Sequence, residues 1–142
     1  MDNYFIQAQR VRRLVQQDFN RVFSLPNALS SDSDPAPEGT KRARSSPTVD
    51  VLLCPTAPTL PPTLESLRGK SPLDAYVNDV FTVPASLAGL PAISLPVRFS
   101  GEGTDAYGVD SVGMQIIAQY GDDELVFDVA EAIEEWGRAG SV

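Results

Sequence analysis

The sequence predicts an α/β fold, because helical and strand patterns alternate along the chain. Apolar residues recur every three or four positions over residues 3–23, which is typical of a helix with one buried face. Short apolar runs bounded by proline or glycine occupy residues 49–54, 92–99 and 111–118 and predict strands. With 142 residues, of which 42% are hydrophobic, the chain can bury a core.

The first predicted unit, residues 1–23, is an amphipathic helix that begins at about residue 3 and is ended by Pro26. Asp2 and Asp18 argue against a mitochondrial presequence, because transit peptides are poor in acids, and no secretory signal pattern is present. The apolar face comprises Tyr4, Ala8, Val11, Val15, Phe19 and Val22, and the opposite face carries Arg10, Arg13 and Arg21.

The second unit, residues 24–48, is predicted to be a polar, disordered insertion. From Ser30 to Thr48 the chain is rich in Ser, Asp, Pro and Gly without periodicity, so it cannot bury enough apolar surface to become ordered. Lys41-Arg-Ala-Arg44 within it resembles a short phosphate-binding or nuclear-import patch. The alternative, a solvated loop, is favoured because three acids lie close by.

The third unit, residues 49–142, begins with the strand 49–54, which is mostly apolar and is expected to be covered on both faces before Pro55 stops it. A proline-rich extended loop follows. Ser71-Pro-Leu-Asp74 places a capping serine, a proline and an acid where a helix starts, which predicts a short helix over residues 72–80. Residues 79–97 then read as a buried turn that leads into a strand.

The remaining elements are two strands and a closing helix. Pro96 cannot donate to a strand ladder, so the strand 92–99 is expected at an edge or bulge. Residues 100–110 are a polar, hairpin-like connection to the strand 111–118. The last helix is expected to start at Asp122-Asp-Glu124, to end before Gly137 and to cover one face of the sheet. Its predicted apolar stripe is Leu125, Val129, Ala132, Ile133 and Trp136.

The sequence excludes several kinds of nucleophilic catalysis. There is no histidine, which removes Ser–His and Cys–His arrangements. A Ser-Ser-Lys system needs a desolvated lysine, but Lys41 and Lys70 both lie in polar segments. Ser86 and Ser94 therefore have no base and are expected to satisfy backbone groups. Cys54, the only cysteine, cannot form an internal disulfide and is expected to be an inert core thiol.

Binding sites for metals, phosphates, nucleic acids and membranes are not predicted. Asp122-Asp-Glu124 is read as a helix start, because three consecutive acids do not converge on one ion. Gly69-Lys70-Ser71 lacks the strand and the earlier glycine of a phosphate loop. Residues 49–142 hold 4 Lys/Arg against 14 Asp/Glu, which disfavours direct nucleic-acid binding. No apolar run is long enough for a transmembrane helix.

Asp79 is the one candidate for substrate binding. It falls at the C-terminal end of the predicted helix 72–80, where the helix dipole disfavours an acid, and Phe81-Thr-Val-Pro84 follows. An acid in this place predicts a bound cation or a hydrogen-bond network. The alternative is an exposed acid that caps the following turn.

Four segments carry a resemblance to a known family. They are Tyr4 to Phe19, Cys54-Pro-Thr-Ala-Pro58, Asp79 to Val97 and Val112-Gly-Met-Gln-Ile-Ile117. Together they resemble the amidase-signature family, and within it the glutamine-hydrolysing subunits of glutamyl-tRNA(Gln) amidotransferases. Gln7 departs from the family pattern, in which lysine is frequent at this position. The long insertion suits a mitochondrial, fungal form.

This resemblance implies a C-terminal fragment of the amidase-signature fold, with a mixed sheet flanked by helices. It implies that Asp79, preceded by Asn78, holds the α-amino group of glutamine. The family's Ser–cis-Ser–Lys triad, and an arginine that faces the α-carboxylate of glutamine, would lie upstream of Met1. The chain alone is therefore expected to be inactive.

The resemblance also implies partners and a location. The intact subunit would pass ammonia to a partner subunit that uses ATP and magnesium to convert Glu-tRNA(Gln) to Gln-tRNA(Gln) in the mitochondrial matrix. No cofactor is expected in this chain. Two alternatives stay open: a fragment of a general amidase that acts on small or lipid amides, and a non-catalytic relic or binding module. Asp79 separates glutamine hydrolysis from the general amidase, because an apolar amide would leave the acid unpaired.

Overall fold

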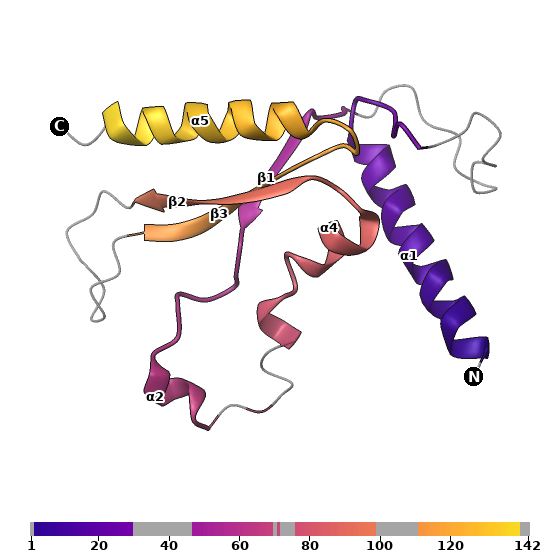
Figure 1. Cartoon of the computed structure of the whole chain (residues 1–142), viewed down its shortest axis with the longest axis horizontal. Coiled ribbons are helices and arrows are strands. Elements are labelled where there is room, and N and C mark those ends of the chain that lie inside the picture. Colours follow the sequence, from indigo (N-terminus) through magenta and orange to yellow (C-terminus); the bar gives the residue numbers. More distant parts are fainter. Residues whose placement is uncertain (1, 30–46, 70, 72–75, 99–110, 140–142) are drawn as a thin grey trace.

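The chain folds around a three-stranded sheet with helices on both faces, as a computed structural model shows (Figure 1). The structure describes residues 2–29, 47–69, 71, 76–98 and 111–139. The predicted α/β class is confirmed. The elements are α1 (Asp2–Val22), β1 (Val51–Pro55), α2 (Leu64–Leu67), α4 (Val83–Ala88), β2 (Ala92–Arg98), β3 (Ser111–Ala118) and α5 (Asp123–Ala139).

The sheet has the order β1-β3-β2, and both strand pairs are antiparallel. Within the described ranges, the only parallel pairing is an isolated bridge between Phe23 and Val49. Pro96 lies in β2, at an edge of this sheet, opposite Gly113 of β3, so the predicted edge position is confirmed. Strand β1 ends at Pro55, as expected, although Pro55 itself is its last residue.

Neighbouring residues of the central strand β3 face opposite layers, because strand side chains alternate. Ile116 packs with Leu95 and Ala130 beneath α5. Ile117 packs with Phe23 and Ala85 on the side of α1 and α4. Figure 1 shows α5 along one face of the sheet and α4 on the other, with α1 descending beside α4.

Helix α5 extends beyond its predicted end, and its predicted apolar stripe is confirmed in part, because Val129 and Ile133 pack against the core. It runs through Gly137 to Ala139, and an ion pair of 3.2 Å between Arg138 and Glu134 spans the glycine. Val126 and Ala130 are its buried residues, and neither was predicted. Trp136 was placed on the apolar stripe but is 75% exposed. Trp136 lies about ten residues beyond Val126, where the helix extends past its apolar contacts with the sheet.

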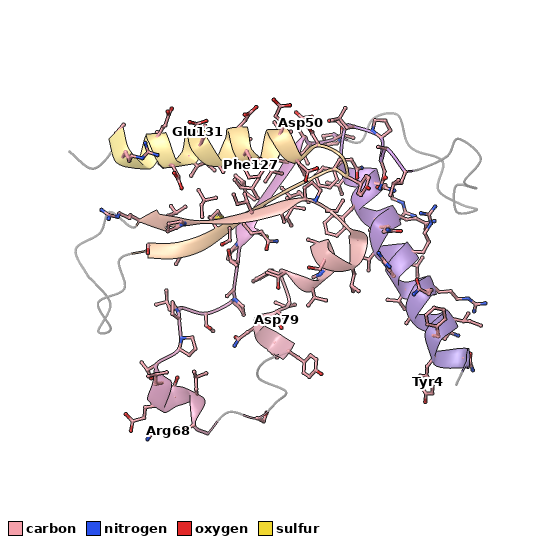
Figure 2. All side chains as sticks on the ribbon, viewed as in Figure 1. Tyr4, Asp50, Arg68, Asp79, Phe127 and Glu131 are labelled. Carbon is pink, nitrogen blue, oxygen red and sulfur yellow. The ribbon has the colours of Figure 1, made fainter. Side chains whose placement is uncertain are left out.

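Helix α1 occupies the predicted residues, but only its C-terminal part packs against the core. The ring of Phe19 stacks on that of Phe23 with centroids 6.2 Å apart, whereas Tyr4 at the other end is 88% exposed (Figure 2). Two side chains of α1 also donate to the last carbonyls of α4: Arg12 to Leu87 at 2.8 Å and Gln16 to Ala88 at 3.0 Å. These bonds satisfy groups that a helix end leaves open.

The segment between β1 and β2 departs most from the prediction. Of the predicted helix 72–80, residues 72–75 lie outside the described residues, residues 76–78 are helical and a turn follows. Helices α2 and α4 were not predicted. Helix α4 has a proline in its first turn, and Gly89 ends it with φ +75°, a left-handed conformation that suits glycine.

One further prediction, for β1, is wrong, and several others fall on residues outside the described ranges. The expectation that β1 is covered on both faces is wrong, because Leu53 is 54% exposed. Most of the insertion 24–48, including Lys41 to Arg44, lies outside the described residues. So do Lys70 and the connection 100–110.

Candidate functional site

A groove opens at the polar end of the sheet face that carries α4. Near Ile117 this face is apolar, with Leu52 and Phe23 around it. Toward the far ends of the strands it becomes polar, with Gln115, Thr56 and Ser94 on the same face by register. The groove has a volume of about 810 Å³. It is lined by residues 55–62 of the proline-rich loop, by the turn residues Asn78, Asp79, Phe81 and Thr82, and by Ser94 and residues 112–114 of the sheet.

Asp79 lies on the wall of this groove, in the turn that precedes α4 (Figure 2). Its backbone carbonyl accepts hydrogen bonds from the amides of Thr82 at 3.1 Å and Val83 at 3.0 Å. The hydroxyl of Thr82 donates to the same oxygen at 3.2 Å. The turn is thus capped by the backbone of Asp79. Its exposed carboxylate has no hydrogen-bond or ion-pair partner in the part of the chain that the structure describes.

A buried glutamine fixes the Asp79 turn to the sheet. Gln115, in the central strand, is 4% exposed, and its Nε2 donates to the carbonyl of Phe81 at 3.2 Å. The same nitrogen lies 3.9 Å from Sγ of Cys54. Gln115 was not among the residues predicted from the sequence. A single amide side chain in an otherwise apolar strand was the available signal, because a buried amide needs a partner.

Two hydroxyls meet on the floor of the groove. Oγ1 of Thr56 and Oγ of Ser94 are 2.6 Å apart, although Thr56 directly follows β1 and Ser94 lies in β2, on opposite sides of β3. Gly113 lies between them, and the Thr56 amide donates to its carbonyl at 2.9 Å. From the sequence, Ser94 was interpreted only as a hydroxyl without a base, and Thr56 was not a candidate.

A second cavity of about 320 Å³ adjoins the groove and shares Thr56, Thr82 and Ser94 with it. Gln115 and Ser86 also line this cavity. Asp79 is the only charged residue that lines either cavity within the described ranges. The combined site is therefore a largely apolar hollow that carries a few hydroxyl and amide groups and one anionic group at its wall.

The site offers no activated nucleophile among the described residues. Neither Ser86 nor Ser94 is bonded to a basic side chain. Burial raises the pKa of the Cys54 thiol above its ordinary value of 9.0, so the thiol stays protonated at neutral pH. Cys54 is half-buried beside the core cluster, and its expected inertness stays a prediction. The described part of the chain holds no group of three or more residues that could bind a metal ion.

Comparisons with known proteins place the chain in a family. The sequence model of the Amidase family matches residues 1–127, and the chain belongs to this family. It is similar to the A subunit of the mitochondrial glutamyl-tRNA(Gln) amidotransferase of Podospora anserina, with 54% identity over 139 residues, and of Ajellomyces capsulatus, with 52% over 151 residues. The corresponding protein of Neurospora crassa is 49% identical over 145 residues.

These relatives are much longer than the chain. The alignments cover 94% of the chain and 26% of the Podospora anserina protein, 94% and 29% for Ajellomyces capsulatus, and 95% and 26% for Neurospora crassa. The chain therefore spans between about a quarter and three tenths of their length. Over the described residues, no helix has the length and apolar character that a membrane span requires.

Proposed function

We propose that this chain is part of the glutamine-hydrolysing subunit of a mitochondrial glutamyl-tRNA(Gln) amidotransferase. Within that subunit, the chain binds the amino group of glutamine. The carboxylate of Asp79 carries this proposal, because it lines a groove and lacks a cationic partner among the described residues. An anion in this position suits a ligand with an ammonium group. We infer the reaction from the relatives, because each of them is named as the A subunit of this amidotransferase.

The residues of this chain bind and orient the substrate in this proposal. Asp79 receives the α-ammonium of glutamine, while Gln115 holds the turn that carries Asp79. Fixing one end of the substrate places its amide at a defined distance from the wall of the groove, which favours reaction at that amide. The nucleophile and its base come from a serine, serine and lysine outside this chain.

The wider assembly follows from the same proposal. Ammonia released from glutamine passes to a partner subunit, which uses ATP and magnesium to amidate Glu-tRNA(Gln) in the mitochondrial matrix. The acidic character of residues 49–142 leaves contact with tRNA to other parts of the complex.

A chimeric enzyme tests this function. This chain replaces the matching segment of the Podospora anserina protein, and the chimera is purified with its partner subunits. We expect ammonia release from glutamine and formation of Gln-tRNA(Gln), with much weaker hydrolysis of butanamide or a fatty acid amide. A soluble chimera that prefers those simple amides would support a general amidase and contradict the proposal.

A further inference from the structure

The Thr56 and Ser94 hydroxyls meet only because Gly113 has no side chain. They belong to chain segments on opposite sides of β3, and two strand spacings separate such segments by about 9.5 Å. A Cβ on Gly113 would lie 2.9 Å from Oγ1 of Thr56 and 3.3 Å from Oγ of Ser94. The glycine thus leaves both hydroxyls uncovered on the groove floor.

This hydroxyl pair has one hydrogen left to donate. Each hydroxyl carries a single hydrogen, and the 2.6 Å contact between Thr56 and Ser94 uses one of the two. The described residues offer no acceptor for the other. Both residues line the larger groove and the smaller cavity beside it. A ligand that fills the groove therefore meets a directed donor.

We propose that the Thr56–Ser94 pair donates this hydrogen to the α-carboxylate of the amino acid whose ammonium Asp79 binds. The inference rests on the proposed function. Asp79 and the pair line the same groove. The pair acts in addition to the arginine that the family resemblance implies for the α-carboxylate, because no cationic side chain of the described residues lines this groove. In glutamine the carboxylate and the ammonium are attached to the same carbon atom, whereas the amide is at the other end of the molecule. A hydrogen bond from a hydroxyl to a carboxylate is charge-assisted and stronger than a neutral one.

Three substrates separate the roles of the groove residues. Glutamine has both charged groups, 4-aminobutanamide lacks the carboxylate, and butanamide lacks both. In the chimera, Thr56→Val and Ser94→Ala should each lower kcat/KM for glutamine about ten-fold and leave the other two substrates unaffected. Thr56→Ser keeps the hydroxyl and should retain most of the activity.

Thr48→Val is the matched control, because Thr48 is exposed and lies outside both cavities. It should leave all three substrates unaffected. Equal losses for all three substrates in Thr56→Val and Ser94→Ala, or no loss for glutamine, would overturn the inference. A loss for glutamine and 4-aminobutanamide alike would also overturn it, since the contact would then not involve the carboxylate.

Asp79→Asn distinguishes this inference from the proposed function. It should weaken glutamine and 4-aminobutanamide but spare butanamide. If Asp79→Asn is selective in this way while the hydroxyl variants are not, only the carboxylate contact is wrong. If Asp79→Asn spares all three substrates, the proposed function itself fails.

Discussion

The side chain of Gln115 and the backbone carbonyl of Phe81 form a 3.2 Å hydrogen bond that joins the central strand to the turn bearing Asp79. Phe81 lies only two residues from Asp79, so the buried amide fixes the position of the candidate binding group. Gln119 is a second buried glutamine, with 1% of its surface exposed. Its side chain donates to Asn20 and to the carbonyl of Leu25, and not to the turn that carries Asp79.

Replacing these two glutamines should separate a local from a global effect. Gln115→Leu and Gln119→Leu each leave a part-buried acceptor without its donor, which should lower the free energy of unfolding by about 1–3 kcal/mol. Urea unfolding of the chain measures this loss. In the chimera, only Gln115→Leu should raise KM for glutamine. An equal rise in both variants would show that general loosening of the fold is responsible.

Gly113→Ala should destabilise the chain by about 1–3 kcal/mol, because the added methyl would overlap Thr56. The backbone bond between the Thr56 amide and Gly113 limits how far Thr56 can move. Gly137→Ala is the control: nothing lies within 4 Å of a Cβ there, and alanine favours the helix by about 0.5–1 kcal/mol. Thermal unfolding of both variants checks the opposite signs. Stabilisation by Gly113→Ala would contradict the tight approach of the two hydroxyls.

Cys54 should react slowly with iodoacetamide at pH 7.5 in the folded chain and faster after denaturation. Burial raises its pKa, so the reactive thiolate is rarer in the folded state than in the unfolded one. Below pH 9.0, the ordinary pKa of a cysteine, the thiol is protonated in both states and the raised pKa does not affect stability. Above that pH the unfolded chain ionises first, so the raised pKa of the folded thiol then favours the unfolded state. Equal alkylation rates in folded and denatured chain would contradict this description.

The chain alone should release no ammonia from glutamine, with or without ATP. It contains no histidine, and its only lysines, Lys41 and Lys70, lie in polar sequence. No base is therefore expected to activate a serine. An ammonia assay with purified chain and a no-protein control measures this. Glutamine hydrolysis that co-purifies with the chain and is lost in Ser94→Ala would show that a nucleophile had been overlooked.

The sequence predicted the parts of the fold that depend on periodicity and chain chemistry. Helix α1 and the edge position of Pro96 followed from apolar spacing and from the missing amide of proline. Helix α4 could not be predicted in this way, because six residues are too few to show a helical period. Its residues form a helix because the sheet and α1 pack around them, and Arg12 and Gln16 bond to its last carbonyls.

In the candidate site, too, some residues could be predicted from the sequence and others could not. Asp79 was predicted, because an acid at a helix end stands out in the sequence. The Thr56–Ser94 pair and Gln115 were not, because their meaning depends on strand register. Thr56 and Ser94 are 38 residues apart and meet only across Gly113. Such a contact leaves no local pattern in the sequence.

The central claim is that Asp79 binds the α-ammonium of glutamine, and Asp79→Asn in the chimera tests it most directly. Asp128→Asn, an exposed acid of α5 away from the groove, is the control. The measurement is kcat/KM for glutamine and for butanamide. Asp79→Asn should cost about 2–4 kcal/mol with glutamine, as expected for loss of a charged partner, and much less with butanamide. Equal losses for the two substrates would mean that Asp79 supports the turn and does not bind substrate.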